Sequence, residues 1–195
     1  MEAFLGLLVG LGLSAACGFR VFVPLLALSI ASLSGHVHLA SPFAWIGTYP
    51  AAVAFATATA FEIAGYYIPV LDHFLDTITT PAAIVAGTII TASFAMDLSP
   101  LVKWSLAIIA GGGLAGTVQA TTVAARAVST GTTGGLGNPI VSTAELGASI
   151  FTSILAILVP VVAIVGLGIG MFFLFRWIIR RRRARPGAAN AVIEV

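Results

Sequence analysis

Long apolar stretches separated by short polar segments run through the whole chain. At about 1.5 Å of rise per residue, a helix needs about 20 residues to cross a hydrocarbon core about 30 Å thick. The stretches are therefore expected to form helices that cross a membrane. They cover residues 4–33, 50–68, 81–96, 101–128 and 140–179.

Two of the apolar stretches are too long for one upright span. Residues 4–33 would form a helix about 45 Å long, so this segment is expected to tilt, kink or break. Gly18 and Pro24 flank Arg20, which places the expected break there. Residues 101–128 are also overlong, and three consecutive glycines lie at their centre. Small residues of this kind let helices approach one another closely.

Pro160 divides the last apolar stretch, residues 140–179, into two pieces. We predict two spans here, and the alternative is one long kinked helix. The chain then contains about six spans. Its halves, 1–97 and 98–179, share the order of an overlong segment, a polar loop and a span with one glutamate. Three spans per half would make a 3+3 inverted repeat with broken or tilted long helices.

The composition indicates that lipid is the main solvent of this chain. Hydrophobic residues make up 59% of it and charged residues 8%, with a mean hydropathy of +1.09. A soluble domain carries roughly 25% charged residues. We therefore expect an all-α, polytopic transmembrane helical bundle, with residues 1–179 forming a single transmembrane domain.

Most of the basic residues lie near the C-terminus. By the positive-inside rule, this asymmetry predicts a cytoplasmic C-terminus. We expect a multi-pass protein of the inner (plasma) membrane, with a disordered basic tail over residues 180–195. The basic residues of this region are Arg176, Arg180, Arg181, Arg182, Arg183 and Arg185.

The segment Ser129–Glu145 is the most distinctive polar stretch and reads STGTTGGLGNPIVSTAE. Glycine and β-branched threonine lower helix propensity, so its first half predicts a tight loop. Asn138 is expected to cap the next helix, with Pro139 at its first position. The loop would offer backbone groups to a ligand, or it would only turn the chain. The expected ligand groups belong to Gly134, Gly135, Gly137 and Asn138.

Ionisable residues within the apolar stretches are candidates for function, because a charge at the bilayer centre costs about 2.5–3.5 kcal/mol. Arg20 is the deepest by position, and its natural partner is Glu62 or Glu145. One interpretation is a structural ion pair. The other is a polar site, because carboxylates bind hard cations and relay protons. In that site Arg20 and Arg126 would balance the charge of four acids, namely Glu62, Asp72, Asp76 and Glu145.

Enzyme motifs are missing from the sequence. It lacks a nucleophile elbow, a P-loop, a Cys/His metal cluster and a G-x-G-x-x-G segment. His36 and His38 form a His-x-His pair without a third ligand nearby. We therefore expect a protein that is not an enzyme and that holds neither a cofactor nor a metal.

Two stretches carry a resemblance to a known family. They are FEIAGYYIPVLDHFLDTITTPAAIVAG and STGTTGGLGNPIVSTAE, and a Gly-Leu-Ser-Ala-Ala run precedes them. Together they resemble small bacterial membrane proteins that carry domain of unknown function 4126, over residues 5–178. The resemblance implies an integral membrane protein and assigns no activity or site. Tyr66 and Tyr67 depart from the family pattern, in which a charged residue is expected, and are further site candidates.

We interpret the chain as a small transporter or channel for an ion or small polar solute. The acids would bind or relay a small cation or proton, and the glycine-rich loop would line the neck of the pathway. The alternative is a non-transporting scaffold or accessory subunit that binds lipid or a partner protein. Membrane lipids and a second copy of the chain are the expected partners, and nucleic acid is not.

Overall fold

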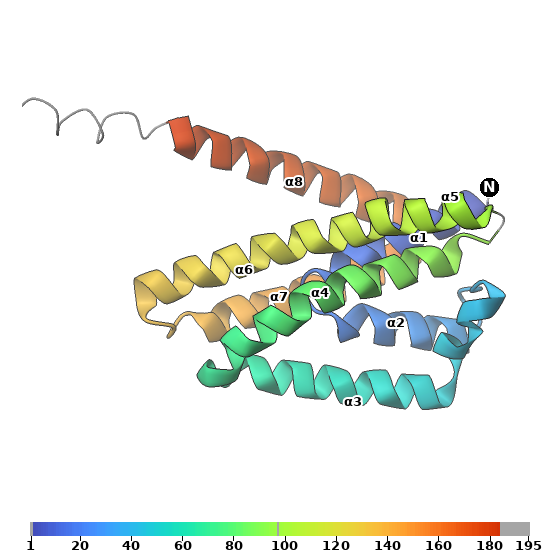
Figure 1. Ribbon diagram of the computed structural model, residues 1–195, viewed down its shortest axis with the longest axis horizontal. Helices are drawn as coiled ribbons and strands as arrows, with labels where there is room; N and C mark the ends of the chain where they lie inside the picture. The colour runs from blue at the N-terminus through green and yellow to red at the C-terminus, as the bar shows by residue number, and fades with distance from the viewer. Residues whose placement is uncertain (1, 97, 184–195) are drawn as a thin grey trace, which may run out of the picture.

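The computed structural model describes residues 2–96 and 98–183, and within these ranges the chain is helical and contains no strand. The all-α prediction is confirmed. Figure 1 shows the long helices lying roughly side by side along the molecule. The elements are α1 (Glu2–Cys17), α2 (Phe22–Leu33), η1 (Ser41–Gly47), α3 (Tyr49–Tyr66), α4 (Pro69–Phe94), α5 (Pro100–Leu106), η2 (Ala107–Gly112), α6 (Gly113–Thr133), α7 (Asn138–Leu158) and α8 (Pro160–Arg183).

The first apolar stretch breaks at Arg20, as expected, and it also reverses direction there. A Cβ added to Gly6 on α1 would lie 3.4 Å from Phe94. The N–H group of Ala40, which follows α2, donates to the carbonyl of Ser93 over 2.8 Å. Both ends of the α1–α2 pair therefore lie at the end of α4, and Arg20 occupies the tip of a helical hairpin (Figure 1).

The structure has a hairpin where the predicted count of six spans has one span, at residues 4–33. Its arms contain 16 and 12 residues. They are about 24 and 18 Å long, shorter than a hydrocarbon core of about 30 Å. Hydropathy does not record the direction of the chain, so a reversal and a long span give the same apolar signal. Residues 4–33 therefore do not form the continuous first span that the count of six spans assumed.

Small and hydroxyl residues place α1 at the centre of the bundle, where it contacts α2, α4, α6, α7 and α8. The Ser14 hydroxyl donates to the Gly87 carbonyl of α4 over 2.7 Å and lies 2.8 Å from the Thr91 hydroxyl. A Cβ on Gly18 would meet the Ala115 carbonyl oxygen of α6 at 2.5 Å. The hairpin tip therefore requires a residue without a side chain at position 18.

The helix α4 begins at Pro69, twelve residues before the predicted third span, which was expected to start at Pro81. Pro81 lies inside the helix and does not interrupt it. Proline removes one N–H donor from the helix but does not prevent helix formation on both sides. The Thr80 hydroxyl donates to the Asp76 carbonyl over 2.7 Å in the same turn. This extension carries Asp76 and Thr79 on the same helix that packs against α1.

The second overlong stretch stays continuous, in contrast to the first. The elements α5, η2 and α6 follow one another without a gap from Pro100 to Thr133, and η2 is a π-helical turn. At this turn a Cβ on Gly87 would lie 2.8 Å from the Gly111 carbonyl oxygen. The close contact between α4 and η2 confirms that the glycines allow close helix packing. The two halves of the chain therefore differ in how their first segments fold.

Within the described ranges, three helical segments are long and apolar enough to cross a membrane: Phe74–Phe94, Pro100–Thr133 and Asn138–Leu158. Shorter apolar helices cover Phe4–Cys17, Phe22–Leu33 and Pro160–Phe173. These segments indicate a membrane protein.

The last apolar stretch forms two helices, as predicted, because α7 ends at Leu158 and α8 begins at Pro160. Figure 1 shows α8 returning along the bundle and diverging from it toward its C-terminal end. The helix continues to Arg183, beyond the predicted boundary at residue 179. Arg185 and the rest of the predicted tail lie outside the described residues.

Candidate functional site

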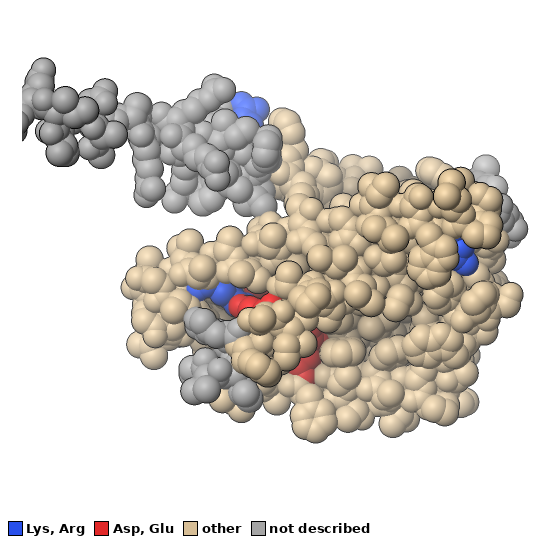
Figure 2. Space-filling view, in the orientation of Figure 1, with Lys and Arg blue, Asp and Glu red and all other residues tan. Residues whose placement is uncertain are grey.

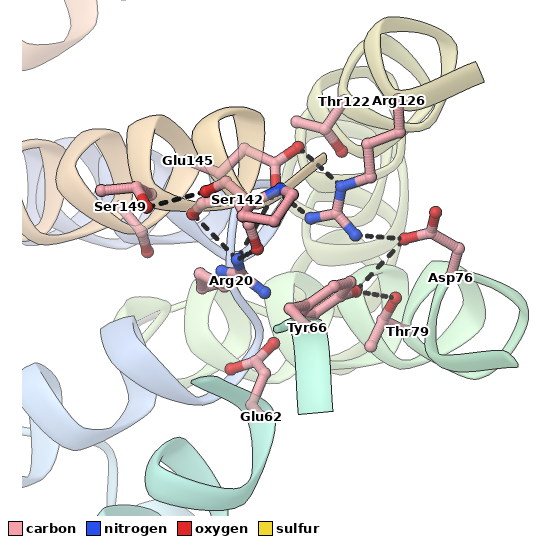
Figure 3. Close-up of polar contacts among 12 residues, drawn as sticks. Arg20, Glu62, Tyr66, Asp76, Thr79, Thr122, Arg126, Ser142, Glu145 and Ser149 are labelled. Atoms are coloured by element: carbon pink, nitrogen blue, oxygen red, sulfur yellow. Dashed lines mark hydrogen bonds and ion pairs between the residues drawn. The ribbon is translucent and has the colours of Figure 1, made fainter. Parts of the chain in front are cut away.

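Charged side chains from five parts of the chain gather around the hairpin tip. We call this group the charge cluster (Figure 3). Figure 2 shows blue and red atoms close together at this end of the bundle, on a surface that is mostly tan and carries two further blue groups elsewhere. The charge cluster consists of Arg20, Glu62, Asp76, Arg126 and Glu145, with the ring of Tyr66 between them.

Arg20 connects the hairpin tip to α7. Its side chain is 1% exposed. Its Nη2 atom donates to the Ser142 carbonyl over 2.9 Å and to the Ser142 hydroxyl. The same atom lies 3.7 Å from Oε2 of Glu145. The break between α1 and α2 positions Arg20, because it leaves the residue outside both helices at the point where the chain turns.

Arg126 joins α6 to α7 and α4. Its Nε donates to Oε1 of Glu145 over 3.1 Å, and its Nη2 pairs with Oε2 of the same carboxylate. Its Nη1 donates to Oδ1 of Asp76 over 2.8 Å. The guanidinium group therefore binds Glu145 through two nitrogens and Asp76 through the third. Such a fork is the geometry in which arginine holds carboxylates most strongly.

Tyr66, at the end of α3, contacts both arginines. The Cζ atoms of Arg20 and Arg126 lie 3.8 and 3.9 Å from its ring centroid. A cation over an aromatic face is attracted by the negative charge of the ring face. The Tyr66 hydroxyl donates to Oδ1 of Asp76 over 3.3 Å and lies 2.9 Å from the Thr79 hydroxyl. Tyr66 is therefore a member of the charge cluster, whereas Tyr67 is 44% exposed.

Glu62 lies on the other side of Arg20 and binds backbone instead of a cation. Its Oε1 and Oε2 atoms accept from the N–H groups of Val21 and Phe22 over 2.8 and 3.1 Å. These N–H groups belong to the start of α2, where the helix dipole favours a negative charge. Glu62 is 4% exposed. Across the parts of the chain that the structure describes, no Lys, Arg or His nitrogen lies within ion-pair distance of it.

The four predicted acids are thus only partly brought together. Asp76 and Glu145 share Arg126, and Glu62 caps α2. The side chain of Asp72 lies outside the described residues.

The glycine-rich loop is shorter than predicted, because α6 continues through Thr133 and only residues 134–137 connect it to α7. Gly134 and Gly135 have φ angles of 65° and 91°, a region that favours glycine. The N–H groups of Gly134, Leu136 and Gly137 donate to Thr130 or Thr133. Most of the loop amides are therefore used within the α6–α7 connection.

The predicted capping role of Asn138 is wrong. Asn138 is the first residue of α7, Gly137 occupies the cap position, and no side chain caps the helix. The Asn138 amide group donates instead to the Thr130 hydroxyl of α6 over 3.0 Å. Pro139 lies in the first turn, as predicted. Asn138 thus closes the α6–α7 connection from the side.

Ser142, Thr79 and Gln119 are members of the site that the sequence analysis did not single out. Gln119 is buried, and its Nε2 donates to the Thr79 hydroxyl over 3.2 Å. A signal for Ser142 exists in the sequence: polar residues recur on one face of α7 at helical spacing. The buried members of this stripe are Ser142, Glu145, Ser149 and Ser153.

An open pocket of about 370 Å³ lies beside the charge cluster, between α4 and α6. Asp76 and Arg126 form its charged wall. Three threonine hydroxyls can donate or accept hydrogen bonds in it. This combination of a carboxylate, a guanidinium group and hydroxyls can bind a small polar molecule. The threonines are Thr77, Thr80 and Thr130.

These features define a helical membrane protein with a buried charge cluster at the tip of a hairpin of half-length helices. The chain belongs to the family described as domain of unknown function DUF4126, whose family model matches residues 7–181. The resemblance drawn from the sequence is thereby confirmed. Neither a curated protein nor a solved structure matches the chain.

Proposed function

We propose that this protein is a small membrane transporter or channel for a small polar solute. The observation that carries the proposal is the charge cluster, which is buried among apolar helices and lies beside an open polar pocket. Ionisable groups are rare within membrane helices and usually mark a pathway for ions, protons or solutes. The half-length helices of the hairpin also resemble the discontinuous helices that form binding sites in transporters.

The fold suggests how the protein lies in the membrane. We propose that α3, α4, α6, α7 and α8 cross the bilayer and that the α1–α2 hairpin enters it from one side. Arg126 and the exposed Arg176 then lie toward the same end of the bundle (Figure 1). The positive-inside rule makes that end cytoplasmic, in agreement with a C-terminus in the cytoplasm of an inner membrane protein. The 3+3 inverted repeat stays a prediction.

The cluster favours some solutes over others. Two guanidinium groups lie next to Asp76 and Glu145, so a metal cation there would be repelled by Arg20 and Arg126. A proton avoids this conflict, because it neutralises a carboxylate without needing a cavity. The pocket offers a guanidinium group, a carboxylate and neutral hydroxyls, and this combination suits an uncharged or zwitterionic solute. We therefore favour a polar solute or a proton over a small metal cation.

Counterflow into vesicles tests the proposal. Purified protein would be reconstituted into liposomes loaded with one of a panel of small amino acids, polyols and organic acids, and uptake of the labelled compound would be measured. Replacing the pocket hydroxyl in Thr80→Val should lower uptake of the transported compound several-fold, since the Thr80 hydroxyl lines the pocket and bonds back to its own helix. Thr57→Val is the matched control, because Thr57 is exposed on α3 and bonds only within its own helix. Uptake equal to that of protein-free liposomes for every compound would contradict the proposal.

A scaffold or accessory subunit is the second candidate. It is favoured by the pairing of Arg126 with two carboxylates, which ties α4, α6 and α7 together without any ligand. In that case the charge cluster serves stability alone. Homo-oligomers fit both candidates, because several α8 glycines face open space where another helix could pack.

A further inference from the structure

We propose that Glu62 is a proton-binding site and that Arg20 responds to its protonation by shifting between Glu145 and Glu62. The inference rests on the proposed transport function in one respect only, namely that the bound proton serves as the coupling ion. The proton site itself rests on the geometry of the hairpin tip.

The first step is the balance of charge in the cluster. The cluster holds the two guanidinium groups of Arg20 and Arg126 and three carboxylates. Arg126 pairs with Asp76 and Glu145, and Arg20 lies 3.7 Å from Glu145. Glu62 is the carboxylate left without an ion pair among the described residues. Binding one proton there makes the cluster neutral.

The second step is how Glu62 is held. Its only hydrogen-bond donors among the described residues are the N–H groups of Val21 and Phe22. A carboxylate accepts both bonds through its two oxygens. A carboxylic acid can keep both bonds, but its O–H oxygen is the weaker acceptor, and the neutral group no longer attracts the positive end of α2. Protonation therefore weakens the attachment of α3 to the start of α2 without removing it.

The third step is the state of Arg20, whose guanidinium group has hydrogen-bond donors without an acceptor among the described residues. Its Nη2 is occupied by Ser142, but its Nε and Nη1 are buried and have no hydrogen-bond partner among the residues that the structure describes. Figure 3 shows the guanidinium group between Glu145 on one side and Glu62 on the other. A buried donor without a partner destabilises the folded state. Arg20 is therefore in a position from which a small shift toward ionised Glu62 gains hydrogen bonds.

The groups that face Glu62 from neighbouring elements do not offer a competing proton site of the same kind. The Cys17 thiol is a neutral group at the end of α1. The Tyr66 hydroxyl bonds to Asp76 and Thr79. The remaining charged groups of the cluster are paired with one another. They are Arg20 from the hairpin tip, Asp76 from α4, Arg126 from α6 and Glu145 from α7.

These steps give the proton an effect on the fold. With Glu62 neutral, Arg20 stays with Ser142 and Glu145, and the hairpin is attached to α7. With Glu62 ionised, Arg20 is drawn toward α3, and its bond to α7 weakens. The hairpin tip thus has two attachments, and the proton selects between them. A transporter that uses such a tip would couple its movement to the proton gradient.

Infrared difference spectra of the purified protein, recorded between high and low pH, test the site. A protonated carboxylic acid gives a carbonyl band that shifts in heavy water and is absent from carboxylates. We expect the bands that appear on acidification to include one that is lost in Glu62→Gln and changes frequency in Glu62→Asp. Glu2→Gln is the matched control, because Glu2 begins α1 and is not part of the charge cluster, and the band should persist in it.

The outcomes separate this inference from the proposed function. A band that persists in Glu62→Gln, or that disappears in Glu2→Gln, places the proton elsewhere and overturns the inference. Absence of any band in the folded wild type overturns it as well. If Glu62→Gln does not fold, the frequency change in Glu62→Asp decides. The spectra do not depend on uptake into vesicles, so the proton site and the transport function can fail independently.

Discussion

Arg20 at the hairpin tip and Arg126 on α6 both pair with one oxygen atom, Oε2 of Glu145. Two cations from distant parts of the chain therefore share one anion in a buried place. Removing Glu145 would leave both guanidinium groups without that counter-charge, whereas removing Arg126 would leave an anion that still has Arg20. Glu145 is thus the anion that links the hairpin tip to α6.

The first prediction concerns the pair Arg126 and Glu145. Each single replacement by alanine should lower the stability of the folded protein by about 3–5 kcal/mol, because it removes the closest counter-charge of a buried ionised group. If the cluster serves stability alone, the double variant should recover much of the loss in thermal unfolding. A transport site predicts instead that charge-neutral single variants such as Glu145→Gln fold stably but lose uptake. A double variant less stable than either single variant would contradict the structural role.

The second prediction concerns the ring of Tyr66. Tyr66→Phe keeps the ring and removes the hydroxyl, so it should cost about 1 kcal/mol through the lost bonds to Thr79 and Asp76. Tyr66→Leu also removes the aromatic face, and it should cost roughly 1–2 kcal/mol more. Denaturation of the detergent-solubilised variants would measure both. Tyr67→Leu is the control for the loss of the ring, because Tyr67 is exposed, and an equal loss in Tyr67→Leu and Tyr66→Leu would show that the arginine contacts are not the cause.

The third prediction concerns the close approach at Gly18. A Cβ there would meet the Ala115 carbonyl oxygen at 2.5 Å, so Gly18→Ala should destabilise the protein by about 1–3 kcal/mol. Gly147→Ala is the matched control, since nothing lies within 4 Å of its Cβ. In that variant alanine should stabilise α7 by about 0.5–1 kcal/mol. Melting temperatures that move in the same direction in both variants would contradict the packing at the hairpin tip.

The fourth prediction concerns the reversal of the chain at Arg20. In a Cys17→Ser background, Phe4→Cys and Ser34→Cys should react with a membrane-impermeant thiol reagent from the same side of sealed vesicles. A cysteine in the α6–α7 connection, Leu136→Cys, should react from the opposite side. If residues 4–33 formed one span, the first two positions would react from opposite sides.

The sequence predicts the helices well and their directions less well. Apolar stretches mark α3, α7 and α8 because hydropathy reports burial in lipid directly. Hydropathy does not detect the reversal at Arg20, because this turn is held by Glu62 and Ser142, which lie far along the chain. The helical course of residues 129–133 was also missed. There the Thr132 and Thr133 hydroxyls bond back to carbonyls of the preceding turn, which local propensity scales do not include.

The site could be predicted only in part, because its contacts also depend on residues that are far apart in the chain. Arg20 and Glu145 are natural partners because few ionisable residues lie in the apolar stretches, and the structure pairs them. The fork of Arg126 on Asp76 and Glu145 needed the positions of three helices. Glu62 as a cap on α2 needed the reversal, which creates a new helix start within an apolar stretch.

The place of Arg20 in the hairpin has a consequence for biosynthesis. Its partner Ser142 lies 122 residues later in the chain. At about 5–20 residues per second, the ribosome delivers Ser142 roughly 6–24 s after Arg20. During that interval the newborn hairpin carries a cation that no part of α7 has yet reached. The hairpin tip can therefore reach its final attachment to α7 only after translation has passed Ser142.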